Sequence, residues 1–175
     1  MSALALLSST PTFAATPGTL GATSTGTVNI SVTKSVQAQI SDLTDMTWPN
    51  WSLGDGAITM TSDVCVYSST GSYRVTATGS GLANIFTLGS GLNLIPYTVT
   101  WNAGGTGALA NTGTTLLTGI ASPTFSTASI TSLSCGGSAN DTARVIVGVS
   151  SVVMTAAASS NTAYTGTLTL LVTPF

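Results

Sequence analysis

This sequence is short of charge and has no histidine. The 175-residue chain carries three Lys or Arg residues and five Asp residues, for a formal net charge of −2. Charged residues make up 5% of it, against roughly 25% in average globular proteins. Three basic residues cannot neutralise a run of phosphates, which argues against nucleic-acid binding and against anionic membrane surfaces. Without His, the chain lacks the commonest general base and the commonest metal ligand.

Long apolar runs are also missing. No stretch approaches the roughly 18 uninterrupted apolar residues that span a bilayer, so we expect no transmembrane segment. Apolar residues nevertheless reach 43%, and about a third of the chain is Ser or Thr. Disordered chains are charged and poor in apolar residues. The composition therefore favours one folded domain with a real core.

The first 14 residues are typical of a truncated secretory signal peptide. A short apolar run at 3–7 precedes a polar stretch at 8–12. Thr12-Phe13-Ala14 then places small residues at the −3 and −1 positions of a cleavage site. A basic region is missing before the run, and an ordinary apolar terminus is the alternative. We expect residues 1–14 to be a signal and the chain to be exported.

The two cysteines, Cys65 and Cys135, lie 70 residues apart without CxxC spacing. In an exported chain an even count of this kind favours one disulfide, which we predict here. Buried free thiols in a cytosolic protein are the alternative. A metal site is disfavoured because no His and no carboxylate cluster accompany either thiol, and we expect no cofactor.

Period-two alternation dominates the remainder of the chain. Residues 15–26 are small, polar and aperiodic and predict a flexible leader. Val28, Ile30 and Val32 then alternate with polar residues, and the same parity resumes over 36–40. Lys34 interrupts the pattern on its apolar face. This predicts two strands in series with a junction near Lys34.

Further short runs predict an all-β sandwich or barrel, because Gly, Asn and Ser clusters separate them. In the last run Leu168, Leu170 and Val172 share one face. No segment shows a convincing helical period. The predicted strands lie near residues 64–67, 73–78, 85–88, 94–101, 115–117, 125–133, 143–153 and 164–172.

The chemistry-bearing residues form no catalytic pattern. We assign Asp42 and Asp45 to turns or caps, since their spacing fits neither an EF-hand nor a glycosidase pair. A Ser-His-Asp triad is impossible without His, and the Gly104–Gly107 run lacks the following Lys of a phosphate loop. Trp48 and Trp51 could stack on a sugar ring, although two Trp around a Pro are more often core and turn. We expect no enzymatic activity.

Several stretches in order resemble one family. The chain is similar to subunits of bacterial chaperone–usher fimbriae, in the branch of spore coat protein U and the archaic Csu-like pilins, over residues 24–175. The resemblance lies in an alternating N-terminal segment, two cysteine regions, a central strand and an alternating last strand. The matching stretches are 26–32, 42–46, 65–67, 73–77, 94–102, 135–137, 143–145 and 164–174.

The resemblance implies an incomplete immunoglobulin-like β-sandwich with an N-terminal donor-strand extension. Residues 15–34 would be leader and donor strand, and residues 35–175 the sandwich domain. A periplasmic chaperone, then the next subunit at an outer-membrane usher, would supply the absent strand. Val28, Ile30 and Val32 would fill the neighbour's groove, bordered by Leu168, Leu170 and Val172. Copies would join head to tail into a cell-surface fimbria that supports adhesion or biofilm formation.

A second class of function stays open. The chain could be a self-sufficient secreted coat protein or carbohydrate-binding β-sandwich, with Trp48 and Trp51 as the sugar contact. It would then be a stable monomer without its N-terminal segment, whereas a fimbrial subunit would polymerise through that segment.

Overall fold

The computed structural model describes residues 14–105 and 109–175, so the predicted signal peptide lies almost wholly outside the described residues. The chain divides into two compact units, Met1–Ser35 and Val36–Phe175. In the first unit every described residue is exposed, and Thr16 and Thr27 exchange two backbone hydrogen bonds of 2.9 Å. The strand predicted around residues 28–33 does not form in this single chain.

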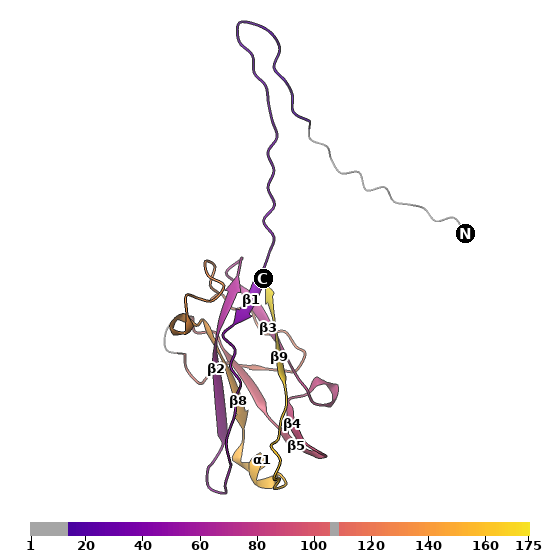
Figure 1. Ribbon diagram of the computed structural model, residues 1–175, viewed down its shortest axis with the longest axis vertical. Coiled ribbons are helices and arrows are strands. Elements are labelled where there is room, and N and C mark those ends of the chain that lie inside the picture. Colours follow the sequence, from indigo (N-terminus) through magenta and orange to yellow (C-terminus); the bar gives the residue numbers. More distant parts are fainter. Residues whose placement is uncertain (1–13, 106–108) are drawn as a thin grey trace, which may run out of the picture. The chain divides into compact units, whose positions relative to one another are not determined.

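The second unit is all-β and antiparallel, as the sequence predicted (Figure 1). Its largest sheet has the order β1-β2-β8-β6-β7, from Ala38–Ser41, Ile58–Ser68, Ala143–Val149, Thr98–Asn102 and Thr114–Leu116. Two further pairs are β3 with β9, from Tyr73–Gly79 and Leu168–Pro174, and β4 with β5, from Thr87–Ser90 and Asn93–Pro96. The short helical elements are η1 (Leu82–Asn84), η2 (Ser138–Asn140) and α1 (Ser151–Ala156).

Buried side chains of β3 pack the β3–β9 pair against the large sheet. In β3, the side chains of Tyr73, Val75 and Ala77 are fully buried, while the intervening residues are only partly covered. Tyr73 meets the fully buried Trp101 of β6 edge to face, and the Trp101 indole N–H donates to the Tyr73 hydroxyl at 3.2 Å. Burial of each large apolar side chain stabilises the fold by about 1.5–3 kcal/mol.

The predicted strand over residues 143–153 is wrong at its end. β8 stops at Val149, and α1 follows directly. Ser150 adopts an extended conformation, and its hydroxyl accepts a hydrogen bond from the backbone N–H of Val153. This side-chain cap starts the helix in spite of Val152 and Val153, whose branched side chains favour strands.

Other predicted boundaries also differ. Residues 125–133 form no strand and make only isolated bridges, Phe125 to Tyr73 and Ser129 to Tyr67. The run predicted over 94–101 is divided at Tyr97 between β5 and β6. β9 begins at Leu168, four residues later than predicted, since Thr165 before it exchanges hydrogen bonds with Gly89 instead.

Candidate functional site: the unpaired edge of β9

β9 is hydrogen-bonded along one edge only. It pairs antiparallel with β3, from Tyr73 opposite Pro174 to Gly79 opposite Leu168. Along its other edge, no hydrogen bond reaches any residue that the structure describes. Backbone N–H and C=O groups on such an edge are a template for a further strand. We call this side of Leu168–Pro174 the β9 edge.

Side chains of β9 present an apolar face towards the core. Leu168, Leu170 and Val172 are half-buried and pack against the core cluster, whereas Leu171 on the opposite face is 59% exposed. The parity predicted from the sequence therefore matches the structure. Half-burial leaves part of each of these apolar surfaces in water.

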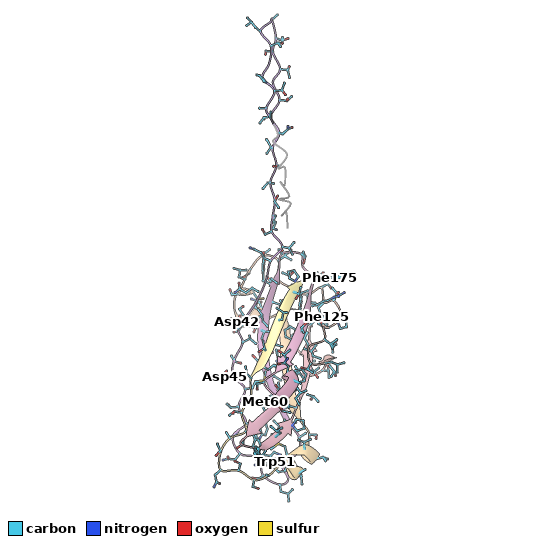
Figure 2. All side chains as sticks on the ribbon, turned by 90° about the vertical axis from the view of Figure 1, so that its right-hand side faces the viewer. Asp42, Asp45, Trp51, Met60, Phe125 and Phe175 are labelled. Atoms are coloured by element: carbon cyan, nitrogen blue, oxygen red, sulfur yellow. A yellow bond between two sulfur atoms is a disulfide. The ribbon has the colours of Figure 1, made fainter. Side chains whose placement is uncertain are left out.

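β1 is the neighbour that β9 does not pair with. The two strands lie close together, yet they belong to different sheets and share no hydrogen bond. Ile40 of β1, with Met46 and Met60, is half-buried against the same core. In Figure 2 Met60 is labelled near the level at which β9 begins. The β9 edge is thus bordered by apolar side chains that the chain itself covers only in part.

The predicted donor residues lie in the first unit, where they pair with no residue that the structure describes. The side chains of Val28, Ile30 and Val32 are 70%, 89% and 95% exposed. Within the described part of the chain, residues 28–36 make no hydrogen bond. An alternating apolar stretch without a ladder leaves both its backbone groups and its side chains in water.

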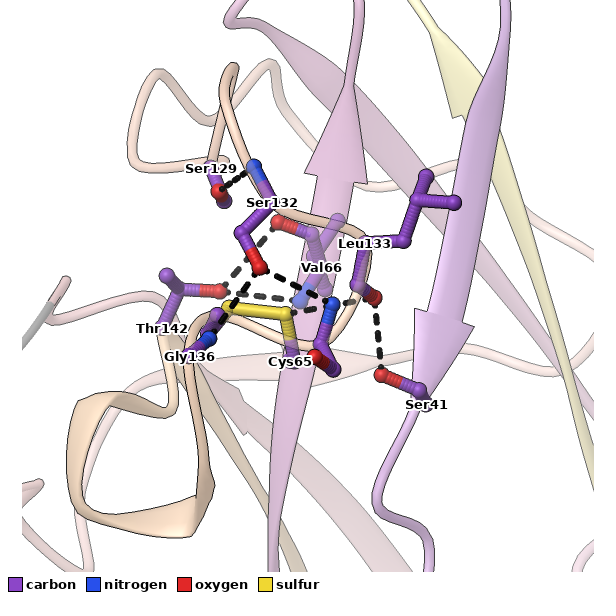
Figure 3. Close-up of a disulfide and its surroundings, with 10 residues drawn as sticks. Ser41, Cys65, Val66, Ser129, Ser132, Leu133, Gly136 and Thr142 are labelled. Carbon is purple, nitrogen blue, oxygen red and sulfur yellow. Dashed lines mark hydrogen bonds between the residues drawn. A yellow bond between two sulfur atoms is a disulfide. The ribbon is translucent and has the colours of Figure 1, made fainter.

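The predicted disulfide is confirmed. Cys65 of β2 and Cys135 are bonded, with their Cα atoms 5.6 Å apart (Figure 3). Neighbouring hydroxyls hold the loop that carries Cys135, because Ser41 donates to the Leu133 carbonyl at 3.1 Å and Ser132 accepts from the Gly136 N–H at 3.1 Å. Closing a loop of this length stabilises a fold by about 4 kcal/mol.

One of the five Asp residues is neutralised by an arginine. Arg144 of β8 donates two hydrogen bonds to Asp63 of β2, from Nε to Oδ1 at 2.5 Å and from Nη2 to Oδ2 at 2.9 Å. Its Nη1 also donates to the side-chain oxygen of Asn111. The hydrogen bonds from Arg144 hold the pKa of the Asp63 carboxyl below its usual range. This cross-strand pair was not found in the sequence, since the partners are 81 residues apart.

Asp42 and Asp141 come together although 99 positions separate their numbers in the chain. Asp141 is buried, and one of its carboxylate oxygens has no hydrogen-bond partner. Burial, and next the nearby negative charge of Asp42, raise the pKa of Asp141. Asp42 itself has a left-handed backbone, with φ of 65°. Their approach depends on how β1 ends, which no local pattern encodes.

The two predicted sugar-contact tryptophans differ in their surroundings. Trp51 is half-buried against the core, and its indole N–H donates to the Gly56 carbonyl at 2.9 Å. Trp48 is 41% exposed. Asp55 caps this loop by accepting a hydrogen bond from the Ser52 N–H at 2.6 Å. The sugar contact stays a prediction.

Two shallow hollows of about 470 and 390 Å³ lie on the second unit. The larger is lined mainly by hydroxyl and small apolar side chains near Cys135, and the smaller by residues of β1 and Tyr67. Among the described residues, no group of His, Cys, Asp or Glu is arranged to hold a metal ion. In the same part of the chain, no helix is long and apolar enough to cross a membrane.

No protein-family model matches this chain, and neither does any curated protein.

Proposed function

We propose that this protein is the structural subunit of an extracellular fimbria, in which copies join by strand addition. The N-terminal segment of one copy, residues 28–32, lies along the β9 edge of the next. Its Val28, Ile30 and Val32 cover the apolar side chains that border this edge. The second unit is then an immunoglobulin-like sandwich that a neighbour completes.

The observation that carries this proposal is that the β9 edge and residues 28–32 are complementary. The β9 edge has free backbone groups and half-buried Leu168, Leu170 and Val172. Residues 28–32 have the same period-two apolar pattern, are exposed, and make no hydrogen bond to any residue that the structure describes. Joining them satisfies both sets of backbone groups, and each buried side chain adds roughly 1.5–3 kcal/mol.

Head-to-tail joining cannot close on itself, because the donating and accepting surfaces differ, and so a fibre grows. Before assembly the β9 edge needs cover, and a periplasmic chaperone and an outer-membrane usher are the partners that the family resemblance implies. Fibres on the cell surface would serve adhesion or biofilm formation. Few charges and a disulfide suit a durable extracellular polymer.

A charge placed in the middle of the donor segment tests the proposal. We expect the purified wild-type chain to form filaments in negative stain and dodecyl sulfate-resistant ladders on unheated gels. Ile30→Asp should abolish both, because a carboxylate cannot be buried unpaired. Asn29→Asp is the matched control, since it adds the same charge on the opposite face and should leave the ladders intact. Ladders that persist in Ile30→Asp would refute the donor role.

The exposure of Trp48 supports the alternative of a secreted carbohydrate-binding protein. In that case the Ile30→Asp chain should still bind glycans on an array, and Trp48→Ala should lose that binding. Trp48 is the better position to change, since Trp51 also holds its loop through Gly56. A wild-type chain that stays monomeric and binds sugar would favour this alternative.

A further inference from the structure

Lys34 is the only lysine in the sequence, and it lies just after the donor segment. The other two basic residues already have partners. Arg144 is paired with Asp63, and Arg74 lies over the Phe175 ring at 3.9 Å and donates to Thr124. Lys34 is exposed and makes no hydrogen bond or ion pair with any described residue.

Two acidic residues follow β1, the strand that lies close to β9. Asp42 and Asp45 are exposed, and neither forms an ion pair with a residue that the structure describes. In Figure 2 Asp45 is labelled at the level of the beginning of β9, and Asp42 nearer to the level of Phe175. Asp42 also lies against the buried Asp141. Among the described residues, no ion pair therefore neutralises Asp42 or Asp45.

In an extended donor segment, the side chain of Lys34 lies on the same face as the apolar residues. Side chains two residues apart share a face of a strand, so Lys34 follows Val28, Ile30 and Val32 onto the face that meets the neighbour. An ammonium group on this otherwise apolar face is unfavourable unless a carboxylate lies within reach.

Direction decides which end of β9 Lys34 meets. Residues 28–34 and 168–174 have equal lengths. If they run antiparallel, Lys34 lies at the Leu168 end, which is at the level of Asp45 in Figure 2. If they run parallel, Lys34 lies at the Pro174 end, next to the cation of Arg74, which pairs with Thr173 in register and contacts Phe175. Attraction at one end and repulsion at the other distinguish the two directions.

We propose that Lys34 of one copy forms an ion pair with Asp45 of the next and so fixes the direction and register of the donor segment. This inference rests on the proposed function. It assigns to Lys34 a positioning role that the apolar residues cannot fill, because Val28, Ile30 and Val32 are alike enough to slip by two residues.

Charge reversal in the full-length chain tests the pair. Lys34→Asp and Asp45→Lys should each slow ladder growth about tenfold at low salt, and the effect should shrink at high salt. The chain that carries both changes restores opposite charges at each contact and should recover to within about twofold of wild type. Growth is followed on unheated gels at several times after refolding.

A matched control moves the lysine without changing composition. Lys34→Ser together with Ser35→Lys places the charge on the opposite face, and it should grow as slowly as Lys34→Ser alone. Single variants that grow like wild type, while Ile30→Asp still abolishes ladders, would overturn the Lys34 pairing and leave the proposed function standing. Failure of the double reversal to recover would overturn the choice of Asp45. Unaltered ladders in Ile30→Asp would instead reject the proposed function.

Discussion

Residues 28–32 and β9 carry nearly the same alternating pattern of branched apolar residues and yet differ in structure. β9 is a strand, paired with β3, and its Leu168, Leu170 and Val172 pack against the core. Residues 28–32 form no strand, and Ile30 is 89% exposed. Alternation decides which side chains share a face, whereas a strand also needs a second chain segment to complete its hydrogen bonds. β9 therefore has hydrogen-bond partners along one edge, whereas residues 28–32 have none among the described residues.

Loss of the disulfide should have the largest effect on stability, and it should act on the second unit and not on residues 28–32. Reduction should lower the free energy of unfolding of the second unit by about 4 kcal/mol, because the unfolded chain regains the freedom of a 70-residue loop. Urea unfolding with and without reductant measures this loss, in the Ile30→Asp chain, which the proposed function predicts to be monomeric. Amide exchange at residues 28–32 should be fast in both states. An unchanged unfolding midpoint would contradict the stabilising role of Cys65–Cys135.

A charge placed on either face of β9 tests whether one face packs against the core and the other is exposed. In the Ile30→Asp background, Leu170→Asp should cost about 2–4 kcal/mol, since it removes core packing and buries a carboxylate in part. Leu171→Asp, on the exposed face, should cost less than about 0.5 kcal/mol. Equal losses in urea unfolding would show that the faces of β9 are assigned wrongly.

If a donor strand completes the second unit as we propose, a peptide with the sequence of that strand should stabilise it. A synthetic peptide of residues 26–34, added to the Ile30→Asp chain at 100 times its dissociation constant, should stabilise the chain by about 2.7 kcal/mol. A rise in thermal midpoint with peptide concentration is the readout. The same peptide with Asp in place of Ile30 is the control. If both peptides act alike, the stabilisation does not come from the apolar face.

The smallest effect concerns pH, which should act almost wholly on the second unit. The raised pKa of Asp141 means that the folded state holds its proton more tightly, so this group's stabilisation is present at low pH and is lost as pH rises above the usual 3.8. The lowered pKa of Asp63 acts oppositely, and its stabilisation is lost as pH falls below 3.8.

Asp141→Asn should therefore raise stability at neutral pH by about 1 kcal/mol, because an amide can donate to Asp42 without charge. At pH 3 the same change should have little effect. Unfolding midpoints at both pH values measure this. A loss of stability at neutral pH would show that the buried carboxylate is held by a favourable partner instead.

Much of the fold was predictable where burial alternates strictly. β3 was predicted to within one residue, because buried Tyr73, Val75 and Ala77 mark one face. The disulfide followed from the cysteine count. α1 was missed because branched residues masked the Ser150 cap, and the strand over 125–133 was wrong because Phe125 and Ser129 meet β3 and β2 only at single bridges.

The borders of the candidate site were only partly predictable. The inward face of Leu168, Leu170 and Val172 follows from parity. That β1 lies beside β9 without pairing, that Asp42 meets Asp141, and that Arg144 neutralises Asp63 all depend on contacts between distant positions. A single sequence carries no local signal for such contacts.

The scarcity of basic residues has a consequence for proteolysis. Trypsin cleaves after Lys and Arg, and Arg74 and Arg144 both lie inside hydrogen-bonded strands. Lys34, in the exposed first unit, is then the one site open to attack on a folded, isolated chain. A single cut there would separate residues 28–32 from the second unit. If copies join as we propose, the same bond would be shielded within a fibre, and the polymer would resist a protease that cuts its free subunits.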